Sequence, residues 1–298
     1  MAVIGKGRRS KILLAKHVET GASVVLKRCM LSGASAYERE LVREEINVHS
    51  QIDHPNVVSF YGSFEDFLGN VYVVLEHACL GDLYDTLQRR VVEKLFESRE
   101  GAPTSRESIL AMKVLRPIVL GLFHTHAMGF VHRDVKAENV FVTGEGRVKL
   151  GDFGFATRAD AVLVDRVGTF VYMAPELLRC TPERRRRARM EKRSLYGKEI
   201  DCWAVGVLAH ELLWGEVPYH ASDENACEDL EKKILETASF EDVDDERKRS
   251  ASPDAIDFVG RSLRSDPVKR LTAYDMLLHP WFSTRATWQN RTGTTASS

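Results

Sequence analysis

The chain has few cysteines, and their spacing excludes the usual cysteine chemistry. Five occur among 298 residues, and no two of them form a C-x-x-C pair: Cys29, Cys79, Cys180, Cys202 and Cys227. A disulfide framework or a zinc site would need paired, closely spaced cysteines. A reducing compartment therefore fits best, and we expect the protein in the cytoplasm, with the nucleus as the alternative.

Long apolar runs and an excess of one charge are also missing. No run approaches the ~20 apolar residues of a membrane span, and the N-terminal segment lacks an apolar stretch of signal-peptide length. The 42 Lys and Arg nearly balance the 43 Asp and Glu, which leaves a net charge of −1. Nucleic-acid-binding domains are usually clearly basic. We therefore expect no membrane attachment and no dedicated nucleic-acid site.

The residue pattern changes about a quarter of the way along the chain. Up to residue 78 it predicts short strands around one helix, which a capping box of Ser35 and Glu38 begins. The strand-like runs are Lys11–Ala15, Ser23–Lys27, Val57–Tyr61 and Val71–Leu75. The break at Cys79–Asp82 predicts a boundary between two lobes.

The remainder of the chain is predicted to be mainly helical. Thr104 and Glu107 have capping-box spacing, and they precede apolar residues that recur at every fourth position. Asp201–Trp214 is apolar on nearly every side, which is typical of a buried helix. Beyond Phe282 the sequence becomes small and polar, and we expect a disordered tail over residues 283–298.

Five short motifs follow one another in a fixed order. Gly5-Lys6-Gly7 and Val24–Lys27 come first, then His132–Asn139 with the sequence HRDVKAEN, then Asp152-Phe153-Gly154 and Ala174-Pro175-Glu176. Each motif alone is weak, but the ordered set is specific. Over residues 3–282 it resembles the eukaryotic protein kinase family. Glu45–Leu83 and Gly168–Tyr172 look most like Aurora and Polo-like kinases.

The resemblance implies an α+β, bilobal protein kinase fold. A small β-rich N-lobe with one main helix would span about residues 1–78, and a larger, mainly helical C-lobe about 82–282. The spacing from Glu176 to Asp201 is longer than usual in the family. A basic insertion over about residues 180–195 accounts for the difference.

The resemblance also assigns the catalytic residues, with ATP and Mg²⁺ as cofactors. Asp134 would orient the substrate hydroxyl and accept its proton, and Lys136 would neutralise the transferring phosphate. Thr169 would bridge these two side chains. Asn139 and Asp152 would bind Mg²⁺, which prefers hard oxygen ligands. Lys27 would hold the α- and β-phosphates, anchored by Glu45, with Glu44 as the competing choice.

The nucleotide site is expected between the lobes, and it departs from the family pattern at several positions. The residues implied to line it are Gly5, Gly7, Ile12, Val25, Lys27, Leu75, Glu76, Ala78 and Phe141. Leu75 matches the gatekeeper, and the backbones of Glu76 and Ala78 would bind adenine. Val25 and Phe141 are bulkier than usual, which predicts a tight pocket. Ser10 replaces the third glycine of the loop, and Arg9 at the loop tip is expected to point to solvent.

Lys136 is typical of serine/threonine kinases, so protein Ser/Thr hydroxyls are the expected acceptors. Asp82 and Glu138 match positions that bind arginines upstream of the acceptor in relatives, although Asp82 could instead contact the ribose. A nucleotide-binding pseudokinase scaffold is the main alternative. A small-molecule phosphotransferase is disfavoured by the motif at Ala174–Glu176, which shapes a peptide site in the family.

Arg133 precedes Asp134, and in relatives this arginine grips a phosphorylated residue of the activation segment. At the corresponding place, three residues before Gly168, stands Asp165. One hypothesis is that Asp165 supplies a fixed negative charge there, which would make activity independent of phosphorylation. The other is a solvated loop aspartate. The resemblance also pairs Arg270 with Glu176.

The small net charge results from cancellation between two segments. Arg184–Arg193 has seven basic residues and one acid, a net +6, which leaves −7 for the rest of the chain. Asp223–Glu246 has eleven acids and two lysines, a net −9. The basic segment could dock acidic partners, act as a nuclear localisation signal, or simply be solvated.

Overall fold

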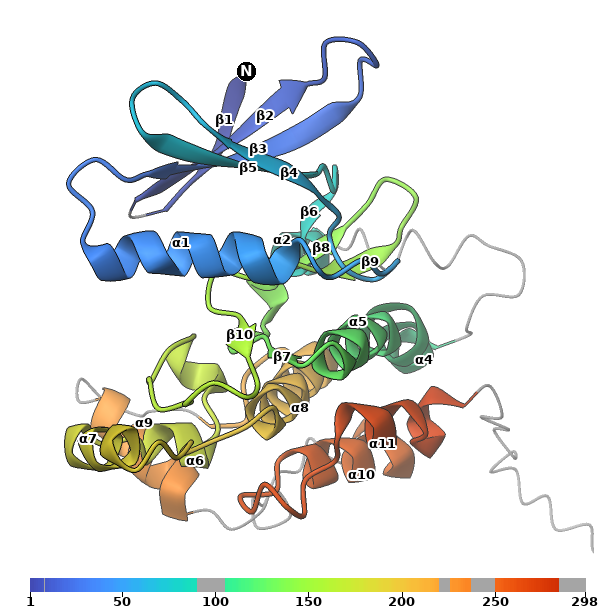
Figure 1. Cartoon of the computed structure of the whole chain (residues 1–298). Helices are drawn as coiled ribbons and strands as arrows, with labels where there is room; N and C mark the ends of the chain where they lie inside the picture. The colour runs from blue at the N-terminus through green and yellow to red at the C-terminus, as the bar shows by residue number, and fades with distance from the viewer. Residues whose placement is uncertain (8, 90–104, 220–225, 237–249, 284–298) are drawn as a thin grey trace, which may run out of the picture.

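The computed structural model describes residues 1–7, 9–89, 105–219, 226–236 and 250–283. Figure 1 shows a β-sheet lobe above a helical lobe, so the expected bilobal fold is confirmed. Of the predicted tail, all but Ser283 lies outside the described residues.

One antiparallel sheet with the strand order β1-β2-β3-β5-β4 forms the N-lobe. Its strands are β1 (Ala2–Lys6), β2 (Ser10–Lys16), β3 (Ser23–Met30), β4 (Phe60–Glu65) and β5 (Asn70–Glu76). Helix α1 (Ala36–His49) lies beneath the sheet, between the two lobes (Figure 1). The predicted capping box is confirmed, since Ser35 Oγ accepts from the Glu38 backbone and the Glu38 carboxylate accepts from the Ser35 backbone.

The strand predicted at Val57–Tyr61 begins three residues later, at Phe60. Val57 instead forms an isolated parallel bridge with Leu150 of the C-lobe. The backbone N–H of Val58 donates to the Leu150 carbonyl at 2.8 Å. Both valines are buried. These β-prone residues therefore form a contact between the lobes and are not part of the N-lobe sheet.

The C-lobe is built around two long, buried helical segments. Its helices are α2 (Leu83–Gln88), α4 (Arg106–Ile109), α5 (Arg116–Ala127), α6 (Pro175–Leu178), α7 (Pro182–Met190), α8 (Glu199–Trp214), α9 (Ala226–Glu236), α10 (Pro253–Ser262) and α11 (Ala273–Leu277). A π-helical turn, Leu110–Leu115, joins α4 to α5. The prediction of a buried helix ending at Trp214 is confirmed, and Gly215 ends α8 with a left-handed φ of 83°.

Ser105 caps the helix that opens at Arg106, and Thr104, the predicted cap, lies outside the described residues. Ser105 Oγ accepts from the Ser108 backbone at 3.1 Å. The predicted capping partner, Glu107, is used elsewhere: it accepts from Ser252 and from the indole of Trp281. The capping-box prediction was wrong because the cap is Ser105, one residue later than predicted, and the Glu107 carboxylate makes tertiary contacts with the end of the lobe.

The continuous helical stretch Arg106–Ala127 is long and apolar enough, by length and composition, to cross a membrane. More than half of its most apolar part, 56%, is buried inside the protein. A buried core helix passes the same test, so the stretch alone does not indicate a membrane span.

Short strands and turns at the top of the C-lobe carry the chemically interesting residues. They are β6 (Gly81–Asp82), β7 (Phe130–Val131), β8 (Val140–Val142), β9 (Val148–Leu150) and β10 (Thr157–Arg158). Strands β6, β8 and β9 form one small sheet, and β10 pairs with β7 in another. The loop from His132 to Asn139 is thus held at both ends, by β7 and by β8.

Candidate active site

The loop after β7 has a strained backbone that a buried carboxylate holds in place. Arg133 has a φ of +67°, which is uncommon for a residue with a side chain. Asp201, in the first turn of α8, accepts the backbone N–H of His132 at 2.9 Å and that of Arg133 at 2.8 Å. Its third donor is His126 Nε2, at 2.8 Å. Our sequence reasoning missed this role of Asp201, although an acid at the start of an apolar, buried helix is a usable signal.

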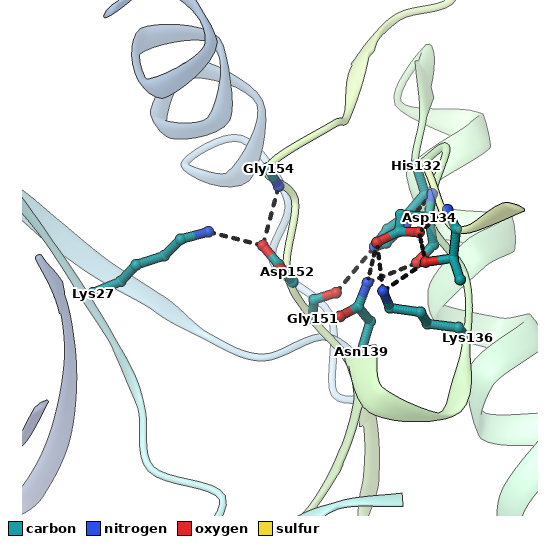
Figure 2. Close-up of polar contacts among 9 residues, drawn as sticks. Lys27, His132, Asp134, Lys136, Asn139, Gly151, Asp152 and Gly154 are labelled. Carbon is teal, nitrogen blue, oxygen red and sulfur yellow. Dashed lines mark hydrogen bonds and ion pairs between the residues drawn. The ribbon is translucent and has the colours of Figure 1, made fainter. Parts of the chain in front are cut away.

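Asp134 projects from this loop into a set of donors (Figure 2). Its Oδ1 accepts from the Thr169 backbone N–H and from Thr169 Oγ1, both at 2.8 Å. Its Oδ2 accepts from Asn139 Nδ2 at 2.8 Å and lies 3.2 Å from Lys136 Nζ. Lys136 Nζ also donates to Thr169 Oγ1 at 2.6 Å. Thr169 therefore bridges Asp134 and Lys136, and the carboxylate is oriented from both sides.

Gly168 allows Thr169 to approach the loop this closely. Its φ is +98°, and a Cβ built on it would lie 2.4 Å from the Arg133 carbonyl oxygen. Any side chain at this position would therefore push the Thr169 backbone away from Asp134.

Lys27, on β3, joins a helix of the N-lobe to the DFG motif. Its Nζ lies 2.6 Å from Glu45 Oε1 and 2.8 Å from Asp152 Oδ1. The alternative anchor, Glu44, accepts instead from Thr157 Oγ1 at 3.3 Å. Burial would lower the pKa of Lys27, but Glu45 and Asp152 raise it. Burial would raise the pKa of Asp152, but Lys27 brings it down to about 2. Lys27 and Asp152 are therefore both charged at neutral pH.

Phe153 of the DFG motif is fully buried between the two lobes. Its ring centroid lies 4.5 Å from that of His49 on α1 and 4.8 Å from that of His132. His49 Nε2 is hydrogen-bonded to the Val58 carbonyl at 2.7 Å, and burial lowers the pKa of His49 to about 4. His49 is thus a neutral packing residue that helps keep α1 and the DFG motif together.

A cleft of about 510 Å³ opens beside Lys27 and Asp152, between the lobes. Apart from Gly7, every residue predicted to line the nucleotide site faces this cleft: Gly5, Ile12, Val25, Lys27, Leu75, Glu76, Ala78 and Phe141. The expected tightness is not evident, because this volume is ordinary for a small-molecule site. Phe141 instead packs so closely on Gly151 that a Cβ there would lie 2.9 Å from its ring.

The loop between β1 and β2 is tied to α1. Arg9 is exposed, as predicted, and its Nε lies 2.8 Å from Glu38 Oε1, an ion pair that the prediction did not include. The capping box places Glu38 in the first turn of α1, within reach of an arginine at the loop tip. Arg8, the neighbouring basic residue, lies outside the described residues.

A buried ion pair supports the segment that joins the lobes, and sequence reasoning missed it. Lys149, on β9, places its Nζ 2.8 Å from Glu76 Oε2, and both side chains are largely buried. The same Glu76 oxygen accepts from the Ser59 backbone at 3.1 Å. Burial would raise the pKa of Glu76, but these contacts lower it. The pair therefore fixes the backbone beside the cleft, where Glu76 and Ala78 are expected to meet a base.

The side-chain oxygens of Asp152 and Asn139 suit a magnesium ion that is also coordinated by phosphates. Asp152 is ionised, and Asn139 uses its Nδ2 on Asp134, which leaves its Oδ1 as a ligand atom. Among the described residues, no three His, Cys, Asp or Glu side chains gather to hold a metal by themselves. Mg²⁺ is typically bound by one or two carboxylates plus substrate phosphates. Asn139 and Asp152 would therefore hold Mg²⁺ together with a nucleotide.

Asp165 and Arg133, which one hypothesis paired, have different partners. Arg133 Nε donates to the Phe155 carbonyl at 2.5 Å, and its Nη1 donates to Tyr196 Oη at 3.3 Å. Asp165 instead accepts from Arg185 and Arg189 of α7. The solvated-aspartate alternative is wrong, since this carboxylate is engaged by two guanidinium groups, and the role of Asp165 as a fixed negative charge stays a prediction.

The family model for the protein kinase domain matches residues 1–282. The chain therefore belongs to the protein kinase family, in agreement with the fold and with the order of its motifs.

Within that family the chain is a protein serine/threonine kinase, and it is similar to Aurora kinases. The Aurora kinase of Encephalitozoon cuniculi is 28% identical over 282 residues, which cover 94% of this chain and 91% of the relative. That of Schizosaccharomyces pombe is 30% identical over 281 residues, 93% of this chain and 69% of the relative. The serine/threonine-protein kinase ste20 of Aspergillus oryzae is 31% identical over 283 residues, but this chain spans 29% of its length.

Proposed function

We propose that this protein transfers the γ-phosphoryl group of ATP to Ser or Thr hydroxyls of protein substrates. The observation that carries the proposal is the arrangement of Asp134. Its carboxylate is oriented by Thr169, Asn139 and Lys136, while Lys27 and Asp152 form an ion pair at the adjoining cleft. Phosphoryl transfer depends mainly on positioning and charge neutralisation, which this arrangement provides.

Each residue has a distinct role in the proposed reaction. Asp134 orients the acceptor hydroxyl and takes its proton. Lys136 neutralises negative charge on the γ-phosphoryl group while it is transferred. Lys27, anchored by Glu45, holds the α- and β-phosphates. Asn139 and Asp152 hold Mg²⁺, which neutralises phosphate charge when it is bound. The scaffold alternative has no support, because the charged residues that pseudokinases usually lose, Lys27, Asp134 and Asp152, are all present, and Lys27 and Asp152 form an ion pair.

A phosphotransfer assay tests the proposal. Purified protein with ATP and Mg²⁺ should label a generic basic protein, with the label on Ser and Thr. Asp152→Asn removes the ionised carboxylate beside Lys27, so labelling should fall at least about 100-fold, as expected when electrostatic stabilisation is lost. An exposed carboxylate serves as the control: Asp53→Asn should keep full activity. Wild-type protein that binds ATP but transfers nothing would support the scaffold alternative.

We further propose a preference for arginine upstream of the acceptor, on the basis of Glu138 and Glu211. Glu211 on α8 is hydrogen-bonded by the Tyr172 hydroxyl. Burial raises the pKa of Glu211, and the nearby charge of Glu138 raises it further. A substrate guanidinium between the two carboxylates would relieve this repulsion. Asp82 contributes less, since its Oδ1 caps α2 by accepting from the Asp85 backbone at 2.8 Å.

Glu138→Gln should lower kcat/KM for a peptide with an upstream Arg by about 10-fold, the loss of roughly one charge-assisted hydrogen bond. The matched peptide with Ala in that position should change less than about twofold. Glu145→Gln removes an exposed carboxylate outside the cleft and should affect neither peptide. Equal rates for the Arg and Ala peptides with the wild-type enzyme would contradict the preference.

The basic insertion is also proposed to dock acidic segments of protein partners. Arg184, Arg186 and Lys192 are exposed on or just after α7, and charge complementarity favours acidic chains there.

The proposed location remains the cytoplasm, with the nucleus as the alternative. Imaging of a fluorescent fusion, with and without these three charges, would distinguish the two compartments.

A further inference from the structure

The activation segment, Asp152–Glu176, has few residues that could be phosphorylated, and the hydroxyl group of each is hydrogen-bonded to a carboxylate. Its hydroxyl residues are Thr157, Thr169 and Tyr172. Thr157 donates to Glu44, Thr169 donates to Asp134, and Tyr172 is bonded to Glu211. Phosphorylation of any of them would break an internal hydrogen bond and place a phosphate beside a carboxylate. An activating phosphate on any of these residues therefore does not fit the observed conformation.

A fixed negative charge, Asp165, lies in the middle of the segment. One of its oxygens, Oδ1, lies 2.9 Å from Arg185 Nη2 and 2.5 Å from Arg189 Nη2. The two arginines are four residues apart on α7 and so share one helix face. Asp165 is 34% exposed and Arg185 31% exposed, so water screens this contact less than a fully exposed pair, whereas Arg189 is 51% exposed and its contact is screened more.

The chain that follows α7 continues the contact. The Leu195 backbone donates to the Leu163 carbonyl at 2.8 Å. Ser194 Oγ accepts from the Leu163 backbone at 3.1 Å and donates to the Ala161 carbonyl at 3.0 Å. Residues 194–195 thus hold the activation segment by its backbone, a few residues before Asp165.

Tyr196 extends this contact to the catalytic loop. Its hydroxyl donates to the Asp165 carbonyl at 2.7 Å and accepts from Arg133 Nη1 at 3.3 Å. Arg133, adjacent to Asp134, is thereby connected to the activation segment through a neutral tyrosine. Figure 1 shows α7 next to α6 at the left side of the C-lobe, away from the N-lobe sheet.

We propose that α7 and residues 194–196 form an internal latch that holds the activation segment in its working conformation without phosphorylation. In the latch, Asp165 supplies the fixed negative charge, and Arg185 and Arg189 supply the positive charges that bind it. This proposal deepens the proposed function and rests on it. It assigns the basic insertion a positioning role in addition to any docking role.

The first experiment compares two double variants of protein that has been dephosphorylated and checked by mass spectrometry. Arg185→Ala with Arg189→Ala should lower kcat on a short peptide by about 10-fold, since two partly exposed ion pairs together are worth up to roughly that factor. KM for ATP should change by less than about threefold. The control, Arg158→Ala with Arg187→Ala, removes two exposed arginines whose partners are Asp160 and Glu191. It should behave like wild type.

Hydrogen exchange provides a readout that does not depend on activity. In the Arg185→Ala, Arg189→Ala variant, the amides of residues 161–167 should exchange at least about 10-fold faster than in wild type, whereas the control should not differ. A charge swap then separates the ion pair from general destabilisation. Asp165→Lys should lose activity, and adding Arg185→Glu and Arg189→Glu should restore at least half of it.

The outcomes distinguish this proposal from the proposed function. Dephosphorylated wild type that is inactive until its activation segment is phosphorylated would overturn the latch. Equal exchange and equal kcat in both double variants would also overturn it, as would a charge swap that restores nothing. Protein that transfers no phosphate in any state would contradict the proposed function, while the exchange measurement would still decide whether α7 holds the segment.

Discussion

Asp134→Asn should lower kcat for phosphate transfer by about 10²- to 10⁴-fold, the usual contribution of a general base. The amide keeps the shape of the carboxylate but cannot accept the substrate proton. Because Asp134 faces Thr169 and Asn139 rather than the nucleotide cleft, KM for ATP should stay within about threefold of wild type. Steady-state kinetics with a Ser peptide would measure both constants.

Two controls make the Asp134 result specific. Asp53→Asn changes an exposed carboxylate in the same way and should leave kcat unchanged. Thermal unfolding should show the Asp134→Asn variant folded, which excludes loss of structure as the cause. A variant that keeps near-wild-type kcat would show that Asp134 does not accept the proton.

Arg270→Met should lower the free energy of unfolding by about 3–5 kcal/mol, as removal of one partner of a buried ion pair usually does. The Arg270 side chain is fully buried, and its guanidinium lies 2.6 and 3.0 Å from the two oxygens of Glu176. It also donates to the backbone carbonyls of Glu199 and Arg264 and lies over the ring of Trp203. Without it, the Glu176 carboxylate remains buried and unpaired. The pairing expected from the sequence is confirmed.

Chemical denaturation of three variants would test this stability prediction. Lys269→Met removes a neighbouring, exposed cation and should cost less than about 1 kcal/mol, as surface ion pairs do. Arg270→Met combined with Glu176→Leu removes both charges and should recover much of the loss, because an apolar pair avoids the desolvation penalty. A loss below about 1 kcal/mol for Arg270→Met would contradict the buried-pair interpretation.

Local features were predicted well where neighbouring residues decide them. The Ser35 cap and the burial of α8 depend on residues within a few positions of one another, so their patterns are visible in the sequence. The cap at Ser105 was missed because Glu107 was expected to form a capping box with Thr104. The Glu107 carboxylate accepts hydrogen bonds from Ser252 and Trp281. Those residues are more than a hundred positions away, and no local pattern reveals them.

The sequence by itself determined the family, the lobes and the identity of the motif residues, because the ordered motifs tolerate little variation in residue type. Only the tertiary structure decided which charges meet. It paired Arg9 with Glu38, Lys149 with Glu76, and Asp165 with Arg185 and Arg189. The physical reason is that long, flexible side chains find partners according to how helices and loops pack in space. Helix α7, in the segment predicted to be an insertion, thereby contacts the activation segment, which its composition alone did not indicate.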